Sequence, residues 1–550
     1  MDSRAKEVIR IGNKAFGDKE TVDSLWQEIA LNFYPERANF TTERIDGEEY
    51  SDHLFSSFPV LARRELANLF ASNLRPRTSK WFSIHVPDEK LDEGIEERKY
   101  LDYLSDVQWR KMYEPSAKMV KATKEGDHDF AAFGNAVIQT SPNISRTGLL
   151  FKNYHLRDNA WSDNAENEID CNHRNWKPTA RQLKHLFPDK VSQNVKKACE
   201  QEPDKVFKCR HVVMPSRLYD YKGRGGKRFP FVSLFVELES ETILEEVGMT
   251  YFPYVIPRWQ TVSDSQYGQS MATQVALPDG RTTQVVLRVL REAGEKYVDP
   301  PMIAVMDAIR SDLALYAGGV TNADIEYDEK LGEVLRPISQ DRSGMPIGFE
   351  IANALKEDIT AAFFLDKIQL PETNTDMTAF EVRRRIEQHF RSAAPLFEPI
   401  EADYNQPLCE NSFHILQAGG AFGPPEWMPE SLRGQDLRYS FRSPINDMAD
   451  ANEAEIFQGI MQTMLLPAAQ MDPALLETAD VSEALRDAMR AAGWKPTWFK
   501  PKEAVEAKRQ ELMQQMQQMQ EMEAAGKIAE IAETGSKGAK TIQEMDSEAT

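Results

Sequence analysis

The sequence predicts an α+β protein made of several sub-domains. Apolar residues recur at helical spacing over about the first 125 residues, short apolar runs alternate with turn residues over about the next 120, and helical spacing then returns. The 550 residues exceed what one hydrophobic core usually supports, and 41% hydrophobic with 28% charged residues is ordinary for a folded globular chain.

The formal net charge of −21 limits the classes of function. A protein that grips DNA through phosphate contacts carries a basic surface, so a general DNA-binding role is not expected. No apolar stretch approaches the roughly 20 residues that span a bilayer, and the N-terminus lacks an apolar signal core. We therefore expect a protein of cytoplasmic origin without membrane contact, and the four cysteines predict reduced thiols.

The N-terminal part is predicted to be helical. A helix that ends near Pro35 places Leu25, Ile29 and Phe33 on one stripe, and residues 58–74 form a second helix.

A charged helix is expected from Val86 to about Lys124, after which "DFAAFGNAVIQTS" turns toward strands. The following runs, such as "VFKCRHVVM" and "FVSLFVEL", alternate with turn signals and predict a β-rich body.

Helical spacing returns from Gly268 to Glu295, with Val286, Leu290 and Ala293 on one stripe. Within this stretch "LPDG" at Leu277–Gly280 predicts a kink or a restart, because proline lacks an N–H and glycine is flexible.

A small insert is expected next, in which "ADIEY" and "EVLRPI" form a hairpin between Ala323 and Ile338. Ile347–Lys367 is predicted to be helical, followed by the polar loop "IQLPETNTD" and a long helix from Met377 with an Arg-rich outer face. Residues 438–499 indicate further short helices, and a Met-striped helix precedes a loose tail after Gly526.

Motifs for phosphate or nucleophile chemistry are absent from the sequence: there is no P-loop, no Gly-x-Ser-x-Gly elbow and no His-Glu-x-x-His helix. Two Cys-x-His pairs, Cys171/His173 and Cys209/His211, raise the possibility of a zinc site. Both pairs lie in stretches that alternate as strands do, and the usual ligand spacing is missing, so we favour strand residues that share a face.

Asp127 and Asp129 flank His128 and suggest a metal site or an acid–base dyad, although a capping cluster before a buried segment explains them more simply. The segment Gly223–Arg228 is expected to be a basic hairpin tip. Arg383–Arg385 are expected on a solvated or partner-facing helix surface, although three adjacent guanidinium groups can also meet a phosphate backbone. His389, on the same helix, is expected to have a structural or solvent-facing role.

The order of several local patterns resembles the portal proteins, or head-to-tail connectors, of short-tailed phages like the T7 group. The patterns are "LRPRTSKWF" at Leu74, "FAAFGNAVI" at Phe130, "PRW" at Pro257, "YG" and "ALPD" between Tyr267 and Asp279, "DPP" at Asp299 and "MTAFEVRRRIEQ" at Met377. The resemblance implies a ring of about twelve subunits at one capsid vertex, through which double-stranded DNA is packaged and ejected.

The resemblance also implies a portal-type fold with an α/β wing, a helical stem, a small βα clip and a helical C-terminal crown. On this sequence the wing would span 1–260, the first stem helix region 261–297, the clip 298–345, the second stem helix 346–368, the channel loop 369–376, the long kinked helix and wing return 377–437, the crown 438–525 and the flexible tail 526–550.

Two groups of site residues follow from the resemblance. The DNA-channel candidates are Lys367, Gln369, Glu372, Asn374 and Asp376, and the partner-binding candidates of the clip are Tyr327, Asp328, Glu329, Lys330 and Leu331.

The implied partners are the terminase packaging motor, the major capsid and scaffolding proteins, a tail adaptor and transiently bound double-stranded DNA. The implied location is the virion, with the host cytoplasm during assembly. No cofactor, metal or catalysis is expected. Two other classes stay open: a metal-dependent nucleic-acid-processing enzyme, and another virion structural protein such as a scaffold or tail adaptor. The strand-rich middle argues against an extended helical scaffold.

Overall fold

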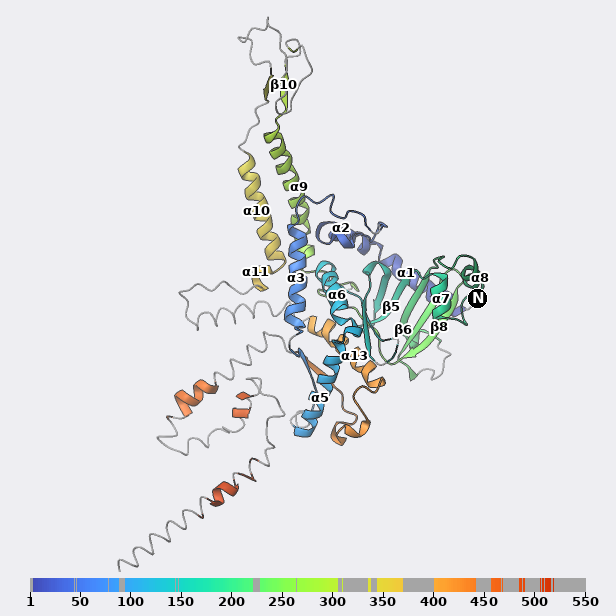
Figure 1. The fold of residues 1–550 in the computed structure, drawn as a ribbon, viewed down its shortest axis with the longest axis vertical. Helices are drawn as coiled ribbons and strands as arrows, with labels where there is room; N and C mark the ends of the chain where they lie inside the picture. Colours follow the sequence, from blue (N-terminus) through green and yellow to red (C-terminus); the bar gives the residue numbers. More distant parts are fainter. Residues whose placement is uncertain are drawn as a thin grey trace, which may run out of the picture. The chain divides into compact units, whose positions relative to one another are not determined.

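The chain divides into two units in the computed structural model. Figure 1 draws the helices and strands of the described residues. Described residues are 3–304 apart from short gaps (44, 46, 78, 89–93, 144, 147, 221–227 and 264), then 309, 335–337, 344–368, 400–441 and short stretches between 457 and 518. Unit 1 comprises Met1–Ile84, Leu104–Trp427 and Tyr439–Asn446, and unit 2 comprises His85–Tyr103, Met428–Arg438 and Asp447–Thr550. Within unit 2, Ser431 Oγ donates to Glu97 Oε1 at 2.6 Å.

The N-terminal part of unit 1 is helical, as predicted. Its helices are α1 (Ser3–Asp18), α2 (Glu20–Phe33), α3 (Phe58–Leu74) and α6 (Met119–Phe133). The predicted stripe of α2 is correct for Ile29 and Phe33 but wrong for Leu25, which is 37% exposed, whereas Trp26 is buried. Trp26 turns inward because its ring packs against the rings of Phe40, Phe133, Trp161 and Tyr267.

The single charged helix expected up to Lys124 is in fact two helices. α5 (Ile95–Met112) ends before a 3₁₀ turn at Pro115–Ala117, and α6 follows. Lys118 starts α6 with φ +55°, a left-handed conformation that breaks any continuous helix here. α6 then continues to Phe133, so the change to strands comes later than the sequence predicts.

Two antiparallel sheets form the predicted β-rich body. The three-stranded sheet has the order β3-β2-β9 and the five-stranded sheet the order β4-β5-β6-β7-β8. Their strands are β2 (Ile138–Pro142), β3 (Leu149–Asn153), β4 (Asn159–Asp163), β5 (Ile169–Trp176), β6 (Cys209–Pro215), β7 (Phe231–Glu237), β8 (Thr242–Met249) and β9 (Tyr254–Val255).

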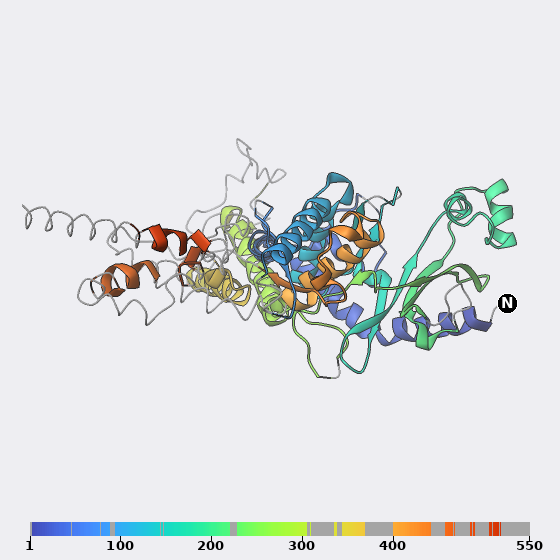
Figure 2. The ribbon, with the colours of Figure 1, turned by 90° about the horizontal axis from the view of Figure 1, so that it is seen from below.

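Helices cover both faces of the five-stranded sheet. α1 packs Ala5 and Val8 onto one face, which includes Val212 and Leu234. The opposite face, which includes Phe235, carries α7 (Ala180–Leu186) and α8 (Gln193–Gln201). Figure 2 shows α1 in blue and the α7–α8 pair in teal on opposite sides of the strands. Side chains alternate along a strand, so both faces need cover, which explains why β6 is buried along its whole length.

A long helical hairpin follows the sheets. α9 (Thr273–Val298) begins five residues after the predicted Gly268 and passes Pro278 without a break, so no restart occurs. α10 (Gly344–Ala362) returns beside α9 (Figure 1), and α11 (Leu365–Ile368) follows after Phe364, whose φ is +55°.

The ladder between the two long helices differs from the predicted hairpin. β11 (Leu335–Pro337) lies within the predicted strand "EVLRPI", but it pairs antiparallel with β10 (Met302–Ala304). Met302–Ala304 is thus a strand that the sequence did not predict. The predicted partner, residues 323–327, lies outside the described residues.

Described residues resume at Ile400, which is followed by a π-helical turn (Glu401–Asn405) and α13 (Gln406–Ala418). The short helices predicted from Arg438 are wrong at their start, because Arg438–Phe441 is the strand β12, which pairs with β1 (Phe82–His85). The pairing is stabilised by Trp81, whose ring stacks on Phe441 at 6.1 Å.

Across the parts that the structure describes, no helix has the length and apolar character that crossing a bilayer requires.

Candidate functional site

The α9–α10 hairpin is held by close packing between its two helices. A Cβ placed on Gly348 would lie only 2.6 Å from Leu290 Cδ2, so glycine allows α10 to approach α9 closely. Leu290 belongs to the stripe predicted for α9, and this stripe therefore faces α10.

Other apolar side chains of the hairpin are exposed to solvent in a single chain. Val285 and Val289, one turn apart on α9, are 54% and 53% exposed. These two valines are thus poorly protected from solvent in a single chain, while Val286 and Leu287 are half-buried. We define the stem apolar surface as the exposed apolar residues of both helices: Val275, Val285, Val289 and Val298 of α9, and Ile347, Phe349 and Ile351 of α10.

The base of the hairpin is anchored to the N-terminal helices. Phe33 at the end of α2 is fully buried and contacts both arms, because its ring lies against Gly280 of α9 and 5.5 Å from the ring of Phe363, just after α10. The base of the hairpin is therefore packed into the core of unit 1.

A side-chain clamp fixes α9 further. Gln284 Oε1 accepts hydrogen bonds from the backbone N–H groups of Phe55 at 2.7 Å and Ser56 at 2.8 Å, and Gln284 Nε2 donates to the Ser56 carbonyl at 3.0 Å. Arg281 adds an ion pair with Glu28 of α2.

Most of the predicted channel and clip residues fall outside the described part of the chain. Lys367 lies in α11. Gln369, Glu372, Asn374 and Asp376, together with Tyr327, Asp328, Glu329, Lys330 and Leu331, lie outside it, as do Arg383–Arg385 and His389. Of the expected basic hairpin tip, only Arg228 is described, and it is exposed.

Asp127 and Asp129 do not cap a helix. Both lie inside α6 and are buried, so the capping interpretation is wrong. Each carboxylate pairs with its own arginine rather than with the other: Asp129 receives two hydrogen bonds from Arg37, at 2.9 and 2.7 Å, and Asp127 pairs with Arg75.

His128 between them meets Arg63 of α3, whose Nη1 lies 2.7 Å from His128 Nδ1. Burial and then the Arg63 charge lower the pKa of His128 to about 4. The imidazole is therefore neutral at pH 7 and accepts the arginine hydrogen bond. The arrangement binds separate segments of unit 1 together, because each carboxylate pairs with an arginine from another part of the sequence.

The two Cys-x-His pairs are strand residues, as predicted. Cys171 and His173 share a face of β5, with Sγ and Nε2 3.6 Å apart, and Cys209 and His211 lie in β6. The strand register places Cys209 opposite Trp176 and His211 opposite Arg174, so the four residues do not converge. No cluster of three or more His, Cys, Asp or Glu side chains suited to a metal ion occurs among the residues that the structure describes.

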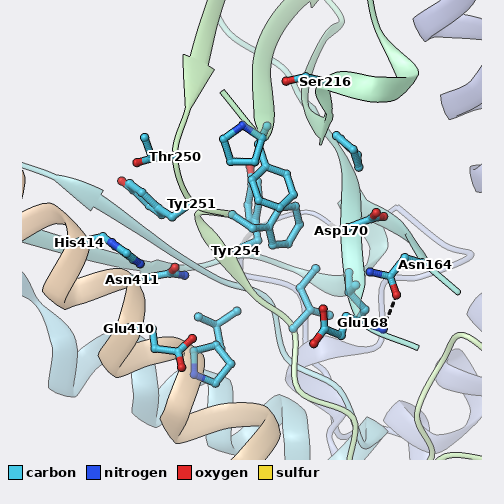
Figure 3. A pocket seen from close by; sticks show the side chains of 18 of the residues that line it. Asn164, Glu168, Asp170, Ser216, Thr250, Tyr251, Tyr254, Glu410, Asn411 and His414 are labelled. Atoms are coloured by element: carbon cyan, nitrogen blue, oxygen red, sulfur yellow. Dashed lines mark hydrogen bonds between the residues drawn. The ribbon is translucent and has the colours of Figure 1, made fainter. Parts of the chain in front are cut away.

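A cavity of about 1330 Å³ opens between α13 and the strands of unit 1. Figure 3 shows Glu410, Asn411 and His414 of α13 on one wall and Tyr251 and Tyr254 facing them. The rings of Tyr251 and His414 are parallel, with centroids 6.0 Å apart, and burial raises the pKa of Tyr251 to about 12.

The charged groups of the cavity are mostly acidic, and its two described arginines are paired. Arg217 donates to Asp170 at 2.8 Å and Arg258 donates to Asp163 at 3.3 Å. Burial raises the pKa of Asp403, and the charge of Arg258 opposes that rise. These residues come from segments far apart in the sequence, with no shared motif, so sequence reasoning had no signal for the cavity.

Comparisons with known proteins match nearly the whole chain. A family model described as "Bacteriophage head to tail connecting protein" matches residues 5–499. A protein named "Portal protein" from Salmonella phage epsilon15 is 24% identical over 512 residues, which cover 90% of this chain and 88% of that protein. A "Probable portal protein" from Bordetella phage BPP-1 is 23% identical over 441 residues, which cover 78% and 76%.

A solved chain from the virion of a native gene transfer agent particle is 11% identical. The alignment covers 78% of this chain and 94% of that chain, with a TM-score of 0.31.

Proposed function

Since the chain belongs to the family of bacteriophage head to tail connecting proteins, the portal proteins, we propose that about twelve copies close into a ring around a DNA channel at one capsid vertex. The function of a portal, a head–tail connector of the virion, rests on the family match and on the names of the relatives. The ring, its channel and its partners go beyond that match.

The observation that carries the ring is the stem apolar surface. Soluble monomers rarely leave large apolar patches uncovered, and Val285 and Val289, one turn apart on α9, are each more than half exposed, as is Phe349 of α10. In a closed ring with head-to-tail contacts, one copy's α9–α10 hairpin would cover the surface of the next copy.

The net charge supports passage of DNA rather than capture. About twelve copies of a chain with net charge −21 carry on the order of 250 negative charges, so an acidic lumen would repel the duplex and let it slide. The loop 369–376, with Gln369, Glu372, Asn374 and Asp376, and Lys367 at its base, is proposed as the collar that meets the DNA.

The clip, residues 298–345, is proposed to dock the packaging motor during filling and the tail adaptor afterwards, with Tyr327–Leu331 at the contact. The wing is proposed to meet the major capsid and scaffolding proteins. Assembly would take place in the host cytoplasm. The chain itself is proposed to be a conduit without catalysis, and the ATP-driven step belongs to a separate motor protein.

Electron microscopy of negatively stained, purified protein tests this proposal. Rings with a central hole are expected. A uniform population of compact single chains at micromolar concentration and physiological salt would contradict it.

A further inference from the structure

A folded insert interrupts the five-stranded sheet. β5 and β6 are antiparallel neighbours, and Trp176 pairs with Cys209 at their junction. Two such strands can be joined by a turn of two to five residues. The chain instead places residues 177–208 between them, which contain α7 and α8; we call this segment the α7–α8 insert.

The insert is an ordered module with its own core. Leu183 of α7 and Val195 of α8 are fully buried and pack with Phe187 against the sheet residue Leu244. Both helices have side-chain caps: Thr179 forms a capping box with Gln182, and Ser192 accepts from the N–H of Val195. Each helix therefore buries one face against the sheet, and its opposite face is exposed to water.

The charge of the insert is opposite to that of the chain. Residues 177–208 hold eight Lys and Arg against four Asp and Glu, within a chain of net charge −21. The pairs Arg181–Asp204 and Lys177–Glu43, at 3.6 and 3.5 Å, are the only ion pairs of the insert's basic residues within the described part of the chain. Its other basic residues form none there: Lys184, Lys190, Lys196, Lys197, Lys205 and Lys208.

The composition of this surface favours a polyanion over a protein partner. Lysine is depleted at the cores of protein–protein interfaces, which are built around aromatic and apolar anchors. The insert exposes two large apolar side chains, Leu186 and Val206, and they lie at opposite ends of α7, since Val206 bridges to Thr179 at the helix start. They do not form one apolar patch. Unpaired lysines on outward helix faces suit the phosphates of a nucleic acid backbone.

We propose that the α7–α8 insert binds the phosphate backbone of double-stranded DNA without sequence preference, on the outside of the subunit and apart from the channel. The inference rests on the proposed function, which brings this protein into contact with packaged duplex. Acidic groups that lie more than about 8–10 Å from these lysines do not prevent the contact, because their charges are largely screened at physiological salt.

Closed circular duplex DNA separates this contact from the channel, because a closed circle has no end that can thread a ring. Binding of full-length protein to small closed circles is measured by gel shift from about 50 to 200 mM salt, the range over which phosphate contacts weaken steeply. The test variant carries Lys184→Glu and Lys197→Glu, which keep good helix formers on α7 and α8. The matched control carries Lys14→Glu and Lys124→Glu, two exposed lysines outside the insert, with the same change of charge.

The expected result is a loss of affinity of about tenfold or more for the test variant, with a shallower salt dependence, and at most a twofold change for the control. Equal binding by the test variant and the wild type overturns the proposal, as does a wild type that fails to bind circles at low salt. If the double variant does not fold, the same binding assay is carried out on a variant with Lys190→Gln and Lys205→Gln, and the same outcomes apply. Both of these lysines lie outside α7 and α8. Binding to closed circles does not require a ring of subunits. If the protein stays monomeric, the proposed ring is contradicted, but DNA binding by the insert can still be measured.

Discussion

The buried ring of Phe33 lies directly against the backbone of Gly280: a Cβ at Gly280 would come within 2.9 Å of Phe33 Cζ. This contact joins the end of α2 to the base of α9. Because Phe33 also packs on Phe363, one aromatic side chain contacts both arms of the α9–α10 hairpin.

Replacing Gly280 with valine is expected to destabilise the protein by about 1–3 kcal/mol, because the new side chain overpacks a fully buried site. Thermal unfolding of unit 1, followed by near-ultraviolet circular dichroism, measures the loss. Gly294→Ala in the same helix is the control, since nothing lies within 4 Å of a Cβ there, and it should be neutral or stabilising by up to about 1 kcal/mol. Equal effects of the two substitutions would contradict the packing described here.

Acidification is expected to destabilise the fold through His128. Its pKa is about 4 in the folded chain against an ordinary value of 6.5, so the unfolded chain binds more protons below pH 6.5. The stabilising contribution is complete above pH 6.5 and is lost as the pH falls toward 4. Melting temperatures at pH 7 and pH 5 should differ less in His128→Gln, whose amide oxygen can accept from Arg63 without titrating. If the melting temperatures of His128→Gln at pH 7 and pH 5 differ as much as those of the wild type, this histidine is excluded as a source of the pH dependence.

The Arg37–Asp129 pair is expected to be structural. Asp129→Ala leaves a largely buried guanidinium without its carboxylate and should cost about 3 kcal/mol, measured by denaturant unfolding. The control is Glu43→Ala, which breaks the exposed pair with Lys177 and should change stability by less than about 0.5 kcal/mol. Metal-dependent DNA cleavage by the wild type that disappears in a folded Asp129→Ala variant would instead assign this site to catalysis.

Deleting Tyr327–Leu331 is expected to abolish docking of the packaging motor and to leave ring formation unchanged, because the deletion removes none of the residues that anchor the α9–α10 hairpin, such as Gly280 and Phe363. Co-sedimentation of rings with the purified motor measures the docking. Unchanged co-sedimentation would reject the clip as the docking surface.

The elements that sequence predicts well are those with a strong local pattern. The α9 stripe at Leu290 recurs at helical spacing and does face a partner helix, and the alternating runs of β5 to β8 are strands. The breaks were less predictable. The sequence around Pro278 predicts an interruption, yet α9 continues through this residue. Packing of the nearby Gly280 against Phe33 stabilises the helix at this point.

The missed features depend on contacts between distant segments. β12 is four residues long and becomes a strand only because β1 pairs with it from more than 350 residues away. The capping interpretation of Asp129 failed because its partner, Arg37, lies far away in the sequence and could not be foreseen. The cavity beside α13 is lined by segments that share no local sequence pattern. The α7–α8 insert did carry a local signal, the capping box at Thr179 and Gln182, which sequence analysis could have used.

Native mass measurement of the purified chain tests the central claim most directly. The account predicts a closed ring of about twelve copies at physiological salt, and a shift toward single chains when Val285→Glu and Val289→Glu place charges on the stem apolar surface. The exposed pair Arg288→Gln and Glu292→Gln, on the same helix, should leave the mass unchanged. A wild-type chain that stays monomeric at high concentration, or a valine variant that assembles like the wild type, would contradict the assignment of this surface to the contact between subunits.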